Sequence, residues 1–390
     1  MKKTILSTAI TALALSSSMA VQAEGFDTVL SDTTVDLNFR YRVESSDVDN
    51  NLDAALANTL KSRITINTGE VSGLSILVEG DNVLHVTEDF NSTENGETQY
   101  NKVVDPETTQ LNQAYLQYKG FDSIVKVGNQ RVNLDNQRHV GGVAFRQDEA
   151  TFDAISVQNQ SIDNTTVVLA IANNRNKIDN TNTEEDIVIA NVKYQVNPEL
   201  ATTGFFYQLD DGTATGQTLG VRAVGKAAGI GYEAELARQT NDITDHAPLY
   251  LHLSASKKLG GLNAKLGFES LGSDDDAGAN AAFAVPLGTN HKFLGWSDVY
   301  LTGAGGNGIQ DLYVSATAKV EGIKLVGQFH KFDAAQGSAD LGTEVGFLAA
   351  KKIKNYGISF KLAHFMSTDD SKGLNKNDTT KVWLTGSAKF

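Results

Sequence analysis

The sequence predicts an all-β protein, namely a transmembrane, antiparallel, up-and-down β-barrel of 18 strands, with 16 strands as the alternative count. Three observations lead to this prediction. Apolar and polar residues alternate with period two along most of the 390 residues, which is typical of strands with two unlike faces. The connections between these segments alternate between short and long. The last segment ends in an aromatic residue, Phe390.

Composition favours one architecture along the whole chain. The net charge of −14 excludes a nucleic-acid binder, and the absence of cysteine excludes a fold held by disulfides. No linker, change of composition or helix-length apolar pattern divides the sequence. We therefore expect a single barrel domain over residues 24–390.

Residues 1–23 have the pattern of an export signal. Lys2 and Lys3 precede a short apolar run at 5–15, and Ala23 offers a small residue for cleavage. The run is too short to cross a membrane as a helix. This pattern predicts a cleaved signal peptide and a location in the outer membrane of a Gram-negative bacterium.

The alternating segments are long enough to cross a bilayer as tilted strands. In the first of them, Val35, Leu37 and Phe39 share one face, while Arg40 and Arg42 share the other. The predicted strands cover 33–45, 57–69, 73–86, 109–119, 122–131, 152–160, 164–174, 186–196, 199–208, 214–224, 227–239, 247–259, 261–271, 309–320, 322–333, 341–352, 355–366 and 378–390.

The connections assign the two ends of the barrel. Every second connection has only one to three residues, as at 70–72, 120–121 and 260, whereas those between are mostly longer, as at 87–108 and 272–308. Short turns on one side and long loops on the other are typical of outer-membrane barrels. An even number of strands then predicts that both termini lie in the periplasm.

A closed barrel satisfies every backbone hydrogen bond inside a bilayer, with an apolar face toward lipid and a polar face toward a water-filled lumen. The expected partners are outer-membrane lipid and lipopolysaccharide, small hydrophilic solutes in the lumen, and the barrel-assembly machinery, which would bind the strand that ends in Phe390. No nucleic-acid partner is expected.

The connector at 132–151 is unusually long and charged, and we expect it to narrow the lumen. Strand alternation directs several basic side chains inward at or near the same level. The candidate pore-lining and constriction residues are Arg40, Arg42, Arg63, Lys126, Arg131, Arg138 and Arg146, together with the acids Asp135, Asp148 and Glu149.

Three roles remain open for these charges. The arginines could pair with Asp135, Asp148, Glu149 and the inward-facing Glu79 and brace the connector. They could instead focus a positive field that concentrates anions, or bind a sugar acid through two-point contacts to its carboxylate. Bracing and anion selectivity are compatible with each other.

Two blocks of sequence resemble the alginate export family of porins. The first comprises Val127–Arg131, Leu134–Arg138, Val140–Gly142, Phe145–Gln147 and Thr151–Ala154. The second comprises His291–Asp298 and Asp311–Tyr313. The resemblance implies an 18-stranded barrel and, among its functions, export of an acidic polysaccharide.

The predicted function is passive diffusion of small hydrophilic solutes, with anions included as a hypothesis. The alternatives are export of an alginate-type polysaccharide and a structural or adhesive barrel. No enzyme is expected, because neither G-x-S-x-G nor H-E-x-x-H occurs. No cofactor is expected, and no metal site either, since no two histidines have ligand spacing.

Overall fold

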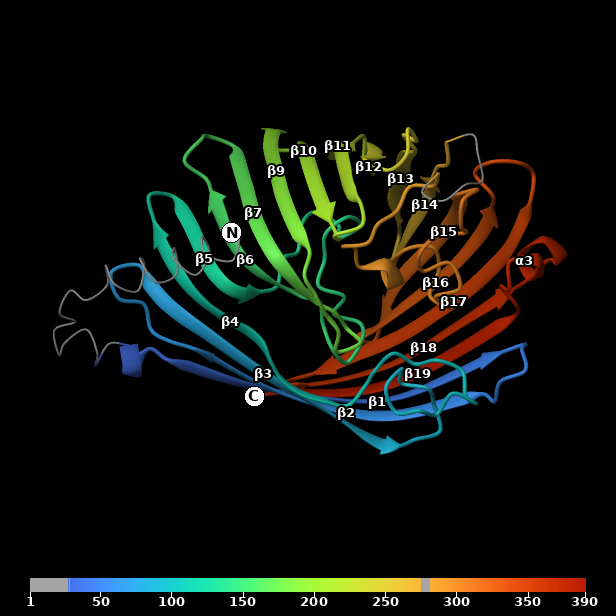
Figure 1. Cartoon of the computed structure of the whole chain (residues 1–390), viewed down its shortest axis with the longest axis horizontal. Helices are drawn as coiled ribbons and strands as arrows, with labels where there is room; N and C mark the ends of the chain where they lie inside the picture. Colours follow the sequence, from blue (N-terminus) through green and yellow to red (C-terminus); the bar gives the residue numbers. More distant parts are fainter. Residues whose placement is uncertain (1–26, 28, 275–280) are drawn as a thin grey trace.

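The computed structural model shows a closed antiparallel β-barrel (Figure 1). It describes residues 27, 29–274 and 281–390, so the expected signal at 1–23 lies outside the described residues. Each wall strand pairs with its neighbour in sequence, and β1 pairs with β19 to close the ring. The prediction of an up-and-down barrel is confirmed.

The strands begin and end within a few residues of the predicted bounds. They are β1 (Thr34–Val48), β2 (Ala55–Asn67), β3 (Leu74–Thr87), β4 (Thr108–Gly120), β5 (Ser123–Gln130), β6 (Thr151–Asn159), β7 (Thr165–Asn176), β8 (Asn182–Thr183), β9 (Asp186–Asn197), β10 (Leu200–Asp210), β11 (Thr215–Ala227), β12 (Ile230–Asn241), β13 (Leu249–Leu259), β14 (Leu262–Leu271), β15 (Ile309–Val320), β16 (Ile323–Asp333), β17 (Asp340–Ile353), β18 (Tyr356–Met366) and β19 (Thr379–Lys389).

The wall contains 18 of these strands within the described ranges. The two-residue β8 pairs only with the end of β7, inside a long loop, and β7 pairs directly with β9. Two short helices, η1 (Asn290–Lys292) and α3 (Asp369–Gly373), lie in other long loops. In the described part of the chain, no helix combines the length and the hydropathy needed to cross a membrane.

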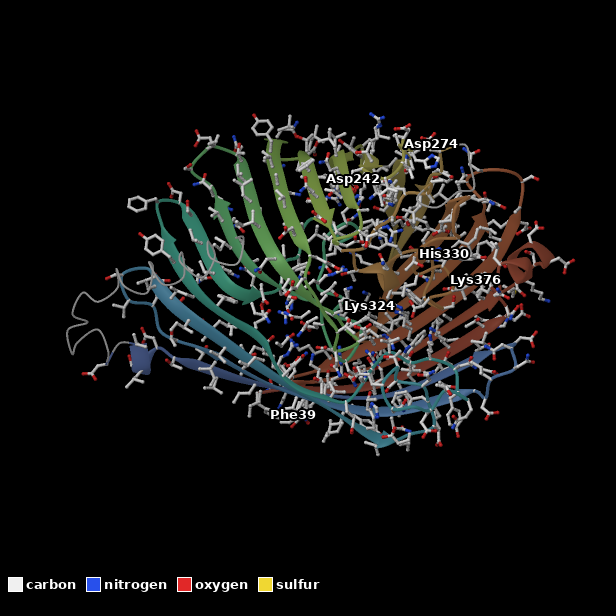
Figure 2. All side chains as sticks on the ribbon, viewed as in Figure 1. Phe39, Asp242, Asp274, Lys324, His330 and Lys376 are labelled. Atoms are coloured by element: carbon white, nitrogen blue, oxygen red, sulfur yellow. The ribbon has the colours of Figure 1, made fainter. Side chains whose placement is uncertain are left out.

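The two faces of the wall follow the alternation in the sequence. On β1, Val35, Leu37 and Phe39 are exposed on the outer surface, whereas Arg42 and Glu44 are buried inside. Figure 2 shows Phe39 pointing away from the interior. The same exposed apolar pattern recurs on strands around the ring, which gives the barrel an apolar outer belt.

The short turns use left-handed backbone where the chain reverses most tightly. Phe121 and Asp122 both have positive φ, at 53° and 52°, and Gly322 has a φ of 81° after Glu321. Positive φ at both central residues is the geometry that matches the twist of a two-residue hairpin. The start of β1 and the end of β19 lie at the same rim as these turns. This rim is called the short-turn rim below.

The core of the molecule lies inside the barrel, toward the opposite long-loop rim. Two long connections fold inward there: residues 131–150, between β5 and β6, and residues 281–308, the described part of the β14–β15 connection (Figure 1). Their apolar side chains pack against inward-facing wall residues. The cluster includes Val140, Phe283 and Leu294 with Tyr250 and Phe332.

Candidate functional site

The 131–150 segment crosses the lumen and is first held by β1. The Arg40 guanidinium donates to the Gln147 side chain at 2.8 Å and to the Ala144 carbonyl at 3.0 Å. The Arg42 guanidinium donates to the Phe145 carbonyl at 2.7 Å. Two arginines of one strand thus hold the segment through its backbone as well as a side chain.

The other part of the segment reaches the far wall. Asn191 of β9 donates to Asp135 at 2.7 Å, and His139 Nε2 lies 2.6 Å from Glu235 Oε1 on β12. Arg138 Nε lies 2.6 Å from Glu269 Oε1 on β14, and both side chains are almost fully buried. Because β1 and β12 lie on opposite sides of the ring, these contacts make the segment a bridge across the lumen.

The 281–308 segment packs against this bridge. The Gly141 amide donates to the Leu287 carbonyl at 2.8 Å, and the Thr289 amide donates to the Gln137 carbonyl at 2.9 Å. The Phe145 ring stacks on His291 with centroids 3.5 Å apart. The two blocks that carry the family resemblance therefore meet inside the lumen.

A cluster of paired charges supports the start and the end of the bridge. Arg63 of β2 binds Asp81 through two 2.6 Å hydrogen bonds and donates to Glu149 at 3.1 Å. Arg131 donates to Glu149 at 2.6 Å and to Glu79 at 2.9 Å. The charges alternate in sign, so they neutralise one another rather than leaving a free positive field.

The two acids of the bridge next to this cluster differ in their proton affinity. Burial would raise the pKa of Glu149, but Arg63, Lys61 and Arg131 outweigh it and lower the pKa to about 2. Burial raises the pKa of Asp148 to about 6, although Gln110 donates to its carboxylate at 2.6 Å. Glu149 is therefore a permanent anion, whereas Asp148 titrates near neutral pH.

The remaining bridge arginine is also paired. Arg146 donates to Glu44 of β1 at 2.9 Å, and its other terminal nitrogen lies 3.7 Å from Asp105. Among the described residues, Arg40 and Arg42 instead bond backbone carbonyls and make no ion pair. For Arg63, Arg131, Arg138 and Arg146 the structure thus shows the bracing contacts.

Two predicted residues lie apart from the cluster of paired charges at the start and end of the bridge. Lys126 has its ammonium 4.6 Å from the centre of the Tyr115 ring, on the wall. Asp135 belongs to the bridge but contacts the far wall, where Arg222 Nη1 lies 3.9 Å away. It is therefore separated from Asp148 and Glu149. Alternation indicates the face of a side chain, but not which partner it meets across a lumen.

Sequence analysis missed Asp105 and the amide partners of Glu79. Glu79 receives hydrogen bonds from Arg131, Asn112 and Gln113, and Asp105 accepts the Gln147 amide at 2.7 Å. The inward parity of Glu79 was readable from the sequence. Its pairing with an arginine was one of the open roles, whereas its further partners Asn112 and Gln113 were not predicted, because strand alternation does not show which amides lie beside it.

A basic cavity lies at the short-turn end of the lumen. Its volume is about 960 Å³. No acidic side chain is among its described lining residues, which include polar Thr317, Ser359 and Thr385 from the inner face of the wall. The lysines that line it are Lys258, Lys319, Lys324, Lys351, Lys352 and Lys389. Lys319 and Lys324 share the inward strand faces of the buried Asp311 and His330, which agrees with this lining.

Comparison with known proteins identifies the fold. No protein-family model and no curated protein match the chain, so the resemblance to the alginate export family gains no support there. Solved structures do match. The chain is similar to OccK9 (OpdG) of Pseudomonas aeruginosa, with a TM-score of 0.73 and 14% identity over 93% of this chain and 99% of that one.

Two further structures extend the comparison. The outer membrane protein OpdK of Pseudomonas aeruginosa matches with a TM-score of 0.71 and 11% identity, over 92% of this chain and 99% of that one. OccAB1 of Acinetobacter baumannii matches with a TM-score of 0.69 and 13% identity, over 92% and 96%. The fold is therefore that of 18-stranded outer-membrane β-barrels. Identities this low establish the fold alone.

Proposed function

We propose that this protein is a passive channel of the bacterial outer membrane that admits small hydrophilic solutes and favours anions. The observation that carries the proposal is the lumen itself. A closed barrel with a polar interior is narrowed by the 131–150 and 281–308 segments and opens below them into a cavity lined by lysines. Solutes would move down their own gradient.

The outer surface supports the membrane location. Exposed Leu, Ile, Val and Phe side chains encircle the barrel, a distribution that water disfavours and a bilayer stabilises. With the short-turn rim in the periplasm, both termini lie there, and the long loops meet lipopolysaccharide outside. The Phe390 backbone pairs with Leu37 at 2.8 and 2.9 Å, and its ring packs edge-on against Tyr356 while Phe390 stays half exposed. The exposed part of the ring is accessible to the barrel-assembly machinery.

The preference for anions rests on the short-turn cavity rather than on the bridge. Most bridge arginines are paired with acids, whereas the cavity concentrates lysines without lining acids. A lumen wall of low dielectric focuses such a field and raises the local concentration of anions. The proposed constriction residues therefore set the width, and the lysines supply most of the positive field that favours anions.

Conductance tests the constriction. Deletion of 136–147 should raise the single-channel conductance in planar bilayers, because the deletion removes the bridge and its contacts to β12 and β14. A matched control removes 243–246, a surface connection outside both inward segments, and should leave the conductance unchanged. Equal conductance of the 136–147 deletion and the native channel would refute the constriction.

Reversal potential tests the selectivity. In a potassium chloride gradient, the native channel should favour chloride, and the Lys319→Gln/Lys324→Gln variant should favour it less. A native channel that selects cations would refute the anion preference and leave the constriction standing.

Block by oligouronates would instead favour the export of an acidic polysaccharide. The two inward segments argue against that alternative, since a polymer needs a wide continuous path. Absence of conductance would favour a structural or adhesive barrel.

A further inference from the structure

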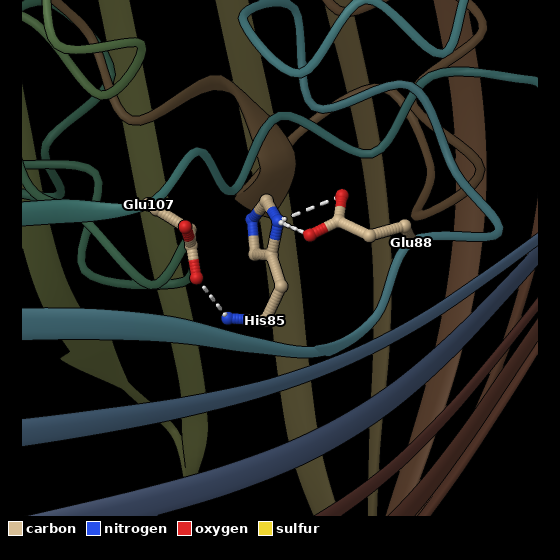
Figure 3. Close-up of side chains that lie close together, drawn as sticks. All are labelled: His85, Glu88 and Glu107. Atoms are coloured by element: carbon tan, nitrogen blue, oxygen red, sulfur yellow. Dashed lines mark hydrogen bonds and ion pairs between the residues drawn. The ribbon is translucent and has the colours of Figure 1, made fainter.

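A histidine and two glutamates converge at the long-loop rim, outside the bridge (Figure 3). His85 lies near the end of β3, Glu88 follows it by three residues, and Glu107 directly precedes β4. One ligand atom from each residue can be chosen so that all three lie within 4.8 Å of one another. The two glutamates thus stand at the two ends of a single long loop.

The His85 ring is held in one orientation. Its side chain is only 3% exposed, its Nε2 lies 2.8 Å from the Asp105 carbonyl oxygen, and Phe90 packs edge-on against it. A carbonyl oxygen can only accept a hydrogen bond, so Nε2 carries the proton. In the neutral ring, Nδ1 is then left with a bare lone pair.

That lone pair faces a carboxylate. Nδ1 lies 3.2 and 3.3 Å from the two oxygens of Glu88. A neutral imidazole nitrogen and a carboxylate are both acceptors, so a proton or a cation must lie between them. The orientation of a histidine by a backbone carbonyl on its far nitrogen is the outer-shell arrangement found at metal sites.

We propose that His85, Glu88 and Glu107 bind one zinc-class divalent ion. Bonds of about 2.0–2.1 Å in a tetrahedron place neighbouring ligand atoms about 3.3 Å apart, which Nδ1 and Glu88 already match. The Glu107 carboxylate, which now accepts the His85 backbone amide at 2.9 Å, lies within the common limit of 4.8 Å and would turn toward the ion. The donor set of one imidazole nitrogen and two carboxylates suits zinc better than calcium or magnesium, which prefer oxygen alone. Solvent at the half-exposed Glu88 supplies the remaining ligand.

The ion would clamp the base of the 88–107 loop. The backbone carbonyl of Asp105 orients His85, and its carboxylate accepts a hydrogen bond from the backbone amide of Gln147, in the bridge, at 2.7 Å. Gln147 is the same residue that Arg40 holds from β1. Bound zinc would therefore stiffen one support of the bridge. This consequence rests on the proposed constriction, whereas metal binding itself does not.

Calorimetry with zinc chloride tests the site on the full chain, refolded in detergent without a histidine tag. The native protein should bind one ion. His85→Gln and the double variant Glu88→Gln/Glu107→Gln should weaken binding more than about 100-fold, since even outer-shell partners account for roughly 10–100-fold. Each glutamine that replaces a glutamate keeps one acceptor oxygen, and gel mobility of the unheated barrel verifies folding.

Glu97→Gln provides the matched control, because Glu97 lies in the same loop, carries the same charge and contacts only Gln99 and nearby loop groups. It should bind zinc as the native chain does. Absence of binding, or equal binding by His85→Gln, would overturn the site and leave an ordinary ion pair. Equal competition by magnesium would overturn it in favour of a diffuse acidic surface.

Hydrogen exchange tests the clamp separately. Zinc should slow exchange in 88–107 of the native protein but not of His85→Gln. Binding without such protection would overturn the clamp. Because neither measurement depends on conductance, a failed zinc site and a failed channel proposal give different results.

Discussion

Replacing Arg138 with methionine should release the tip of the bridge from β14. Its side chain is fully buried, and its Nε lies 2.6 Å from Glu269 Oε1. Tyr250 donates to the same oxygen at 2.9 Å. After Arg138→Met, the buried Glu269 carboxylate would keep one neutral donor and no cation. Loss of one partner from a buried ion pair costs about 3–5 kcal/mol.

This loss of free energy should destabilise the packed position of the bridge rather than the barrel wall. The strands are held by continuous ladders around the ring, whereas the tip of the bridge depends on a few side-chain and loop contacts. Since about 1.4 kcal/mol changes an equilibrium tenfold, the ratio of packed to released tip should fall roughly 10²- to 10⁴-fold. Hydrogen exchange in 137–147 should quicken, and open-channel current noise should grow, while gel mobility of the folded barrel stays native.

A compensating substitution separates the charge effect from lost packing. Arg138→Met/Glu269→Gln keeps an acceptor for Tyr250 and removes the unpaired buried charge, so exchange in 137–147 should slow again relative to the single variant. Native-like exchange in Arg138→Met would refute the reasoning. So would a double variant that exchanges as fast as the single one.

Three further predictions concern pH, backbone and assembly. Burial raises the pKa of Asp148 to about 6, so the neutral carboxyl group stabilises the packed bridge in acid. This stabilisation is lost as the pH rises through that value. Protonation of Asp148 between about pH 7.5 and pH 5 should also increase the preference for chloride. Reversal potentials of Asp148→Asn should lose this dependence, and an unaltered dependence would assign it to another group. Gly128 has a φ of 131°, and a Cβ there would lie 2.3 Å from the Ala114 carbonyl oxygen. Gly128→Ala should lose roughly 1–3 kcal/mol in urea unfolding, whereas the control Gly204→Ala, with open space around its Cβ, should lose less; equal losses would contradict the clash. Phe390→Ala should refold in detergent like the native chain, because the Phe390 backbone bonds remain, but should reach the outer membrane of cells in lower amounts. Equal amounts in cells would contradict recognition of the ring.

Much of the wall could be predicted because its two environments impose a strict period. Each strand presents one face to the apolar exterior and one to the polar interior, so a shift of one residue would reverse every side chain. The 18 strands and the inward parity of Arg40, Arg63 and Lys324 therefore follow from local alternation. The short turns fix antiparallel neighbours in the same way.

The interior could be predicted only in part. The length and charge of 132–151 indicated an inward segment, but three readings of its arginines remained open. The structure brings Glu269 to Arg138 and Glu44 to Arg146, partners that lie more than a hundred positions away in the sequence, and thereby shows bracing. The packing of 281–308 against the bridge left no periodic signal, since both segments are irregular.

The sequence by itself determined the barrel, its strand bounds and which side chains enter the lumen, because bilayer-type patterning acts on each strand locally. Only the tertiary structure decided which charges neutralise one another, where six lysines line a cavity that has no acid among its described lining residues, and how His85 meets Glu88 and Glu107. Those outcomes depend on closure of the ring and on loops that fold across it. Closure joins residues whose separation along the chain carries no information about their distance in space.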